Sequence, residues 1–487
     1  MDLTFTFKGP RLKHSLLAVA LCCTFLMGCS VEAVSSWVEE LQRIISPLPS
    51  PAPTLAPTST PVSTPTLEPT ATPASSTLAL RFWVPDFLDP AASAGEGAPD
   101  ATGAGVLRGQ VADFARMSPV VQVEMLVKKA SGAGGLYDLL STAYGVAPSI
   151  VPDLLVLGRQ DLLAAAGAGL VQPLDAYLPP DAAYFEAALS DMQTPEGLWA
   201  FPYVATAEQM AYRSTVTTTA PVTWTGVLSN SFSLVLPGTT QDAVSTDMLL
   251  AMYIGAGGRT VDTNGQATLN RSVLEQMYAF LLDAQTAGLL NPEQALALDD
   301  TEACWEVYQQ GGASLAPVPV GTYWRAYLNM PAENEAAPTP EPAAEETATP
   351  APVSLPADTL PTWVPTVSGQ PVTVMRTWGL AIVTQDPARR EVVLELLRWL
   401  VSAQQMADLT QSLGLTPTRR QAVQAWDLGP EEQDFVLQLL SNAVTAPDAG
   451  ADLAVRRALQ AGLIAILQGE ATTPDAAASQ ALTSLRR

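Results

Sequence analysis

Histidine is almost absent from this sequence, since the only one is His14, near the N-terminus. Without imidazole in the mature chain, Ser-His-Asp and Cys-His catalysis, histidine general bases and ordinary zinc sites are excluded. Positive charge is also scarce: once residues 1–28 are removed, 21 basic residues face 47 acidic ones, a formal net charge of −26. Such a surface repels nucleic acid and anionic lipid head groups, so we expect no nucleic-acid partner.

The N-terminal segment has the order of a secretory signal. Basic residues (Lys8, Arg11 and Lys13) precede an apolar run from Leu16 to Met27, and Leu26-Met27-Gly28-Cys29 resembles the bacterial lipobox. A transmembrane anchor is the alternative, but the run is about a dozen residues long and spanning needs about 20. We therefore expect residues 1–28 to be a lipoprotein signal peptide. Lipid on Cys29 would anchor the chain to the outer face of the cell membrane.

Cysteine supports no cross-link in the mature chain. Cys22 and Cys23 leave with the signal, Cys29 would be lipidated, and Cys304 then has no partner. A disulfide or a cysteine metal cluster is therefore excluded, and we expect neither a metal nor a cofactor. Cys304 is expected to pack as a small hydrophobe beside Trp305.

Two stretches are rich in proline and threonine. Residues 46–76 contain almost no charge and favour polyproline II, so we interpret residues 29–76 as a lipid-anchored tether. Residues 331–361 repeat this chemistry with added Glu and Ala, which predicts a disordered surface insertion.

Between these stretches, strand and helix patterns alternate. Alternating apolar residues predict strands, and apolar residues at helical spacing predict helices. The predicted strands are 78–84, 121–127, 153–157 and 372–383, and the predicted helices are 106–117, 135–144, 389–408, 452–468 and 474–485. This order predicts an α/β fold with parallel, doubly wound sheets, and about 380 ordered residues suit two domains.

Six segments, in this order, carry a resemblance to a known family. They are Thr194–Tyr203 continuing to Arg213, Pro221–Thr225, Gly257-Gly258 with Asp262–Gly265, Thr377–Ile382 with the following helix, Leu413–Arg419, and Leu467-Gln-Gly469 with Thr473-Pro474. Together they resemble family 1 extracellular solute-binding proteins of the maltose-binding type, which deliver ligands to ABC importers. The sequence departs from that pattern at Arg213, where the family usually has Asn.

The resemblance implies a two-lobed periplasmic-binding-protein fold of type II. Each lobe would be a mostly parallel sheet flanked by helices, with crossing hinge strands between them. Lobe 1 would comprise 77–205 and 373–425, and lobe 2 would comprise 206–372 and 426–487. The implied partners are a small-molecule ligand and ABC transporter permease subunits, and the chain is expected to be a monomer.

Ligand contacts are expected from loops that face the interlobe cleft. The candidates are Trp83, Asp86, Arg159, Gln160, Tyr203, Thr206, Glu208, Gly238, Gln241, Tyr323, Trp324 and Trp378. An indole beside a carboxylate suits a sugar ring, but Trp83 and Trp378 could equally be core residues, Asp86 a turn residue, and Arg159 and Gln160 a solvated helix start. Thr206 falls where sugar-binding relatives often place an acid. Asp262 and Asn264 fit an ordinary β-turn better than a calcium loop.

The leading hypothesis is a non-catalytic protein that captures a small solute, with a carbohydrate favoured by the aromatic candidates. Only Lys128 and Lys129 remain as lysines in the mature chain, which argues against a highly anionic ligand. The alternatives are a surface sensor or adhesion lipoprotein of the same fold, and a carboxylate-based glycosidase. No local motif pairs two carboxylates for the latter reaction.

Overall fold

The computed structural model describes residues 77–90, 105–147, 149–177, 183–239, 244–330 and 355–486. The predicted signal peptide, Cys29, the tether, Gln241 and most of the predicted insertion lie outside these ranges. The insertion prediction was wrong at its C-terminal end. Leu355 is buried, and residues 359–362 form a strand paired with residues 210–213.

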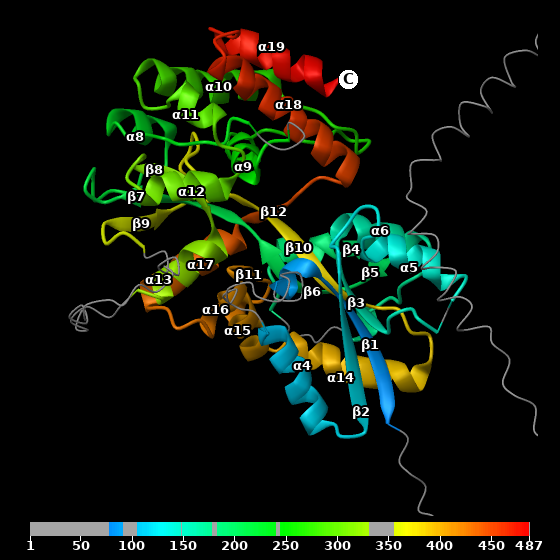
Figure 1. The fold of residues 1–487 in the computed structure, drawn as a ribbon. Helices are drawn as coiled ribbons and strands as arrows, with labels where there is room; N and C mark the ends of the chain where they lie inside the picture. Colours follow the sequence, from blue (N-terminus) through cyan, green and yellow to red (C-terminus); the bar gives the residue numbers. More distant parts are fainter. Residues whose placement is uncertain are drawn as a thin grey trace, which may run out of the picture. The chain divides into compact units, whose positions relative to one another are not determined.

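A seven-stranded mixed sheet forms the larger part of the fold (Figure 1). Its strands are β1 (Leu78–Pro85), β2 (Val121–Lys128), β3 (Leu154–Gly158), β6 (Phe201–Thr206), β10 (Thr373–Ile382), β11 (Thr416–Pro417) and β12 (Ala443–Thr445). The order is β11-β6-β10-β3-β1-β2, with β12 paired to the start of β10. Parallel pairing joins β1 to β2 and β3, so the carboxyl ends of these three strands share one edge.

Two smaller sheets complete the strands. β7 (Glu208–Arg213) lies between β8 (Leu315–Pro319) and β9 (Thr359–Thr362), and β4 (Gln193–Thr194) pairs with β5 (Gly197–Leu198). All of these pairings are antiparallel, as are those of β10 with β3 and β6. The α/β fold class is confirmed, but the sheets are mixed rather than mostly parallel.

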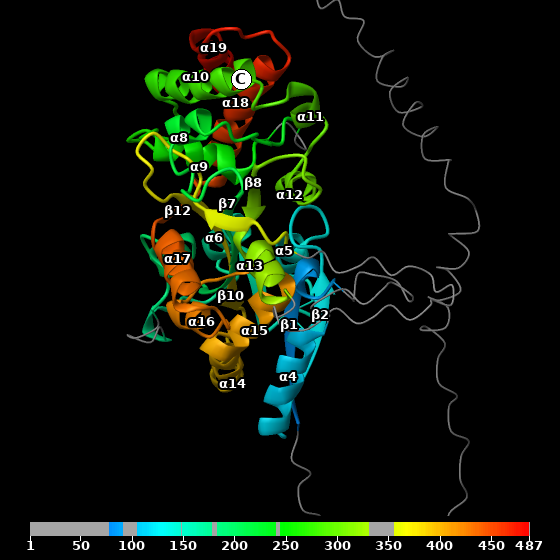
Figure 2. The ribbon, with the colours of Figure 1, turned by 90° about the vertical axis from the view of Figure 1, so that its left-hand side faces the viewer.

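The helices pack into two hydrophobic cores. The first core, around the larger sheet, includes residues of α4 (Val106–Met117), α5 (Leu136–Tyr144), α6 (Arg159–Gly167), α7 (Glu186–Asp191), α12 (Thr301–Gln309), α13 (Val320–Leu328), α14 (Pro387–Leu400), α15 (Ala403–Leu413), α16 (Arg420–Gln424) and α17 (Pro430–Ser441). The second core includes residues of α8 (Trp224–Ser229), α9 (Asp247–Gly255), α10 (Arg271–Thr286), α11 (Pro292–Leu296), α18 (Ala449–Leu467) and α19 (Pro474–Leu485). Figure 2 shows α16 and α17 beside α13, where Trp324 contacts Phe435.

The chain passes between the parts of the fold that hold the two hydrophobic cores at three places, which we call the crossing segments. They are the β6–β7 junction, the first residues of β10, and β12 with the turn that leads to α18. At the second crossing, Thr373–Met375 pair with β12, and Arg376 onward pairs with β6.

Most predicted elements are confirmed within one or two residues, including α4 at 106–117 and α19 at 474–485. The long helix predicted at 389–408 is instead two helices, α14 and α15, because Val401 and Ser402 interrupt it. Ser402 has extended backbone angles (φ −61°, ψ 152°) and stands at the N-cap of α15, a position that serine favours. Cys304 is fully buried, as expected.

Gly379 gives a test of the packing in the larger sheet. A Cβ there would lie 2.7 Å from Cβ of Ala200 and would also contact the buried Met192 sulfur. We expect Gly379→Ala to lower the unfolding free energy by roughly 1–3 kcal/mol through overpacking. The control is Gly109→Ala on the exposed face of α4, where an added Cβ would have no neighbour within 4 Å outside the adjacent residues and the backbone of its own helix. It should raise stability by roughly 0.5–1 kcal/mol. Urea unfolding of both variants measures the difference, and equal effects would contradict this packing.

Candidate functional site

Several polar and aromatic side chains gather where β1 and β3 end. Trp378 is partly exposed, and its ring lies 5.0 Å from that of Phe87 at an interplanar angle of 62°. The indole also covers Gly158, since a Cβ on this glycine would lie 3.2 Å from Nε1 of Trp378. Asp86 precedes Phe87 and accepts a hydrogen bond from its N–H at 3.1 Å. The carboxyl ends of parallel strands are where open sheets bind ligands, so this edge is a candidate site.

An open polar cavity of about 400 Å³ lies at the same edge, beyond the end of β2. We call it the edge cavity, and it is lined by Ser131, Gly132, Tyr137, Asp138, Gln160 and Asp161. These residues come from the turn after β2 and from the first turns of α5 and α6, which Figure 1 shows close together. Burial raises the pKa of Asp161. The cavity therefore offers hydroxyl, amide and carboxyl groups beside one aromatic ring.

The turn that shapes the edge cavity depends on glycine. Gly132 and Gly134 have φ values of 75° and 73°, which favour residues without a Cβ. Gly135 approaches the Ser131 backbone so closely that a Cβ would lie 2.6 Å from its carbonyl carbon. The turn is closed by the N–H of Gly134, which donates to Oδ2 of Asp138 at 2.8 Å. This geometry places the Lys129 ammonium nitrogen 3.9 Å from the Cβ position of Gly132.

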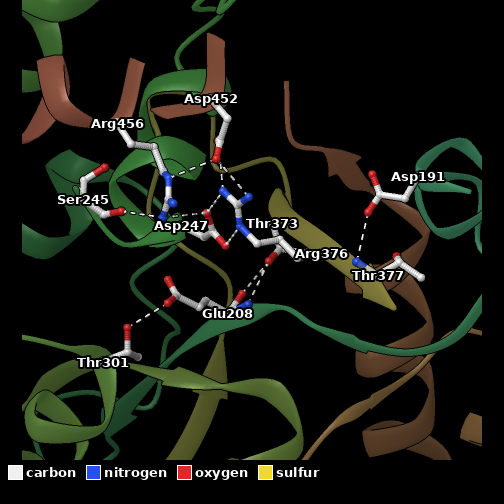
Figure 3. Close-up of polar contacts among 10 residues, drawn as sticks. All are labelled: Asp191, Glu208, Ser245, Asp247, Thr301, Thr373, Arg376, Thr377, Asp452 and Arg456. Carbon is white, nitrogen blue, oxygen red and sulfur yellow. Dashed lines mark hydrogen bonds and ion pairs between the residues drawn. The ribbon is translucent and has the colours of Figure 1, made fainter. Parts of the chain in front are cut away.

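A second polar group joins the crossing segments, centred on Arg376 (Figure 3). Nε and Nη2 of Arg376 donate to the two carboxylate oxygens of Asp247 at 2.6 and 2.7 Å. Nη1 and Nη2 also donate to Asp452, both at 3.0 Å. Arg456 adds a hydrogen bond to the carbonyl of Ser245 at 2.9 Å and an ion pair with Asp452 at 3.3 Å. β10 is thus tied to the start of α9 and to α18 by charged hydrogen bonds.

Glu208, at the first crossing, has a buried carboxyl group beside this network. One oxygen accepts a hydrogen bond from Thr301 at 2.7 Å, while Oε2 is buried without a partner among the described residues. Burial, and next the nearby Asp247 carboxylate, raise the pKa of Glu208 to about 8, although hydrogen bonds from Thr301 and the Met248 N–H lower it. Glu208 is therefore mostly protonated at neutral pH.

Arg159 and Asp191 form hydrogen bonds next to β10 in the larger sheet. Arg159 donates to the carbonyls of Ser190 and Asp191 at 2.9 and 3.1 Å and to Asp448, in the third crossing segment, at 2.8 Å. Asp191 accepts from the Thr377 N–H at 3.0 Å, and burial raises its pKa to about 6 against the influence of Arg159. Arg159 thus links the start of α6 to a crossing segment.

The structure brings together four of the residues predicted from sequence and separates the others. Asp86, Arg159 and Gln160 directly follow β1 and β3, and Trp378 lies on β10 opposite Gly158, the last residue of β3. Thr206 and Glu208 lie at the first crossing. Trp83, Tyr203, Tyr323 and Trp324 are buried in the first core, and Nε1 of Trp324 donates to Gln209. Gly238 is buried, and its N–H and carbonyl bond to Ala295 and Gln460. Ligand binding by these residues stays a prediction.

Other polar residues at these places were not predicted. Ser131, Tyr137, Asp138 and Asp161 line the edge cavity, and Asp247, Arg376 and Asp452 form the crossing network. A glycine-rich segment that follows two lysines at the end of a predicted strand was the available signal for the cavity. The crossing network gave no such signal in the sequence, because Arg376 is more than 70 residues from both Asp247 and Asp452 along the chain.

Within the described ranges, no group of three or more His, Cys, Asp or Glu side chains is arranged to hold a metal ion. In the same part of the chain, no helix has the length and apolar character needed to cross a membrane.

Comparison with known proteins gives a consistent result. The family model of bacterial extracellular solute-binding proteins matches residues 111–433. No protein of curated function matches the sequence. The structure is similar to the cyclic alpha-maltosyl-1,6-maltose binding protein from Arthrobacter globiformis (TM-score 0.60, 15% identity, 84% of this chain and 98% of that chain). It is also similar to maltose-bound T. maritima MalE3 (0.59, 17%, 84% and 99%). A third similar structure is the GacH receptor of Streptomyces glaucescens, known unliganded and with acarbose (0.57, 16%, 84% and 98%). At sequence identities this low, the similarity to these structures shows a shared fold and no more.

The buried carboxyl of Glu208 predicts a pH dependence of stability. Its pKa is raised from 4.5 to about 8 on folding, so between these values the folded state binds more protons than the unfolded state. The contribution is complete below about pH 4.5 and is lost as pH rises toward 8, by at most about 1.4 kcal/mol of unfolding free energy per pH unit.

Glu208→Gln keeps the shape and removes the charge, so we expect its stability to fall less than that of the parent between pH 5 and 8. Urea unfolding at several pH values measures both slopes. Identical slopes would show that Glu208 does not titrate in this range.

Proposed function

Because this chain belongs to the bacterial extracellular solute-binding protein family, we propose that it captures a small carbohydrate between two lobes and passes it to the permease of an ABC importer. The proposed role is binding without catalysis. The supporting observation is the edge at which the partly exposed Trp378 packs on Phe87 and Gly158. Asp86 precedes Phe87 in the sequence, and Arg159 and Gln160 follow Gly158. Solute sites of this kind combine an aromatic surface with a few placed polar groups.

A sugar fits this combination of groups. The apolar face of a sugar ring packs on an aromatic ring, while its hydroxyls donate to carboxylates and accept from amides. Trp378 and Tyr137 provide rings, and Asp86 and Gln160 provide the polar partners. The names of the three similar structures refer to maltose, a maltosyl-maltose and acarbose, which supports the same ligand class.

The crossing segments would act as the hinge between the lobes. We infer that lobe 1 comprises 77–205 and 373–425 and lobe 2 comprises 206–372 and 426–487. Closure on a ligand would turn one lobe against the other at few backbone positions. Arg376 keeps β10 bonded to α9 and α18, so bending would fall on the residues that follow it.

Lipid anchoring would keep the binding domain close to the membrane in which its transporter lies. We infer that residues 1–28 are removed, that Cys29 carries lipid, and that residues 29–76 tether the domain near its transporter. Tethering raises the effective concentration of the captured solute at the permease without any new contact.

Trp378 supplies a direct test. Titration of the purified full chain with neutral and acidic mono- and oligosaccharides should give a saturable change in tryptophan fluorescence for at least one sugar. The melting temperature should rise by mass action. Trp378→Phe should weaken that binding about tenfold and reduce the signal, because the smaller ring gives less contact. The control is Trp399→Phe on α14, whose indole N–H donates to the carbonyl of Gln110. It should keep the affinity.

The bound sugar should be recovered chemically unchanged. Hydrolysis of the sugar would contradict a binding role without catalysis. Absence of a fluorescence or melting-temperature change with every sugar would contradict the carbohydrate proposal.

A further inference from the structure

The two lysines of the mature chain lie at the candidate site. Lys128 ends β2 and Lys129 begins the turn that shapes the edge cavity. Lys129 is exposed, and its ammonium nitrogen lies next to Gly132, which lines the cavity. Among the described residues, no carboxylate forms an ion pair with either lysine. Their charge is therefore available at this edge.

This placement is unusual for so acidic a chain. The sequence has 48 acidic and 24 basic residues, so carboxylates outnumber cations. Several arginines, among them Arg213, Arg376 and Arg389, are paired with carboxylates of the same chain. An ammonium group without such a partner beside a cavity attracts an anionic ligand group. Composition alone shows that lysines are few. Their position beside the edge cavity shows in addition that the positive charge is concentrated where a ligand would bind.

We propose that the captured sugar carries a carboxylate, as a uronic acid or an oligosaccharide containing one, and that Lys129 binds this carboxylate. The proposal rests on the carbohydrate-binding function and specifies its ligand class. It requires a single negative charge on the ligand, held by one lysine, so it is compatible with the overall charge of the chain, which argues against a highly anionic ligand.

The remaining groups of the edge cavity suit the rest of such a ligand. Tyr137 is partly exposed and offers a ring face, and the exposed Gln160 offers an amide to sugar hydroxyls. Asp138 and Asp161 can accept hydrogen bonds from hydroxyl groups, and one oxygen of Asp138 is already bonded to the turn. These two carboxylates would repel a phosphate dianion more strongly than a carboxylate, which carries half its charge. The cavity therefore favours a uronate over a sugar phosphate.

Matched pairs of sugars test the charge directly. Isothermal titration of the full chain would compare glucose with glucuronate, galactose with galacturonate, mannose with mannuronate, and neutral with uronate oligosaccharides. We expect one acidic member to bind at least tenfold more tightly than its neutral counterpart. Raising the salt concentration should weaken that binding and leave the neutral sugar unaffected, because exposed charges are screened.

Lys129→Gln separates the role of the charge from that of the fold. We expect this variant to lose at least tenfold in affinity for the acidic sugar, to keep its affinity for the neutral one within about twofold, and to melt as the parent does. The control Arg398→Gln removes the same charge from the exposed side of α14 and should change neither affinity.

Each result decides the proposal. Equal or tighter binding of the neutral sugar, or an unchanged preference in Lys129→Gln, would overturn the carboxylate assignment and leave carbohydrate binding intact. Failure of every sugar, neutral or acidic, would overturn the proposed function as well.

Discussion

The Arg376 guanidinium is held by carboxylates from two different helices, Asp247 on α9 and Asp452 on α18, while its backbone pairs with Thr206 in the larger sheet. One residue thus belongs to the sheet by its backbone and to the second helical layer by its side chain. Removing the guanidinium would leave the two mostly buried carboxylates with Arg456 as their one remaining described cation, which costs several kcal/mol. The orientation of β10 at the crossing, and with it the position of Trp378 two residues later, depends on this contact.

The neighbouring Glu208 shows the other side of the same electrostatics. Arg376 compensates Asp247 and Asp452, but Glu208 faces Asp247 and has only neutral hydrogen-bond donors, Thr301 and the Met248 N–H. The crossing therefore keeps one carboxyl group neutral among several charged ones. Asp191, on the side of the larger sheet, also has a raised pKa, because burial outweighs the influence of Arg159, but at about 6 this pKa leaves it mostly ionised at neutral pH. Such groups are tolerated because each has at least one hydrogen bond.

Local patterns predicted the local structure well. Helical spacing located α4 and α19, because each of these helices has one buried face that the sequence repeats. Alternating apolar residues located β1 and β2, although β1 is buried on both faces over its second half. Long-range contacts had no such signal. Sequence alone did not show that Trp324 would be buried against Tyr323, Tyr327 and Phe435, or that Arg376 would meet Asp452. Aromatic type and loop position suggested ligand contact for Trp324 and Trp378 alike, and only the packing distinguishes them.

The rarity of lysine has a practical consequence for anyone who handles this protein. Within residues 29–487, the only lysine side chains are those of Lys128 and Lys129, adjacent in sequence at the end of β2. Amine-reactive dyes, cross-linkers and sensor surfaces would therefore all attach to one edge of the sheet. A protein immobilised by that chemistry would be uniformly oriented, with the turn beside the edge cavity against the support. Capture through carboxyl groups, which are abundant and widely spread, would leave that edge open.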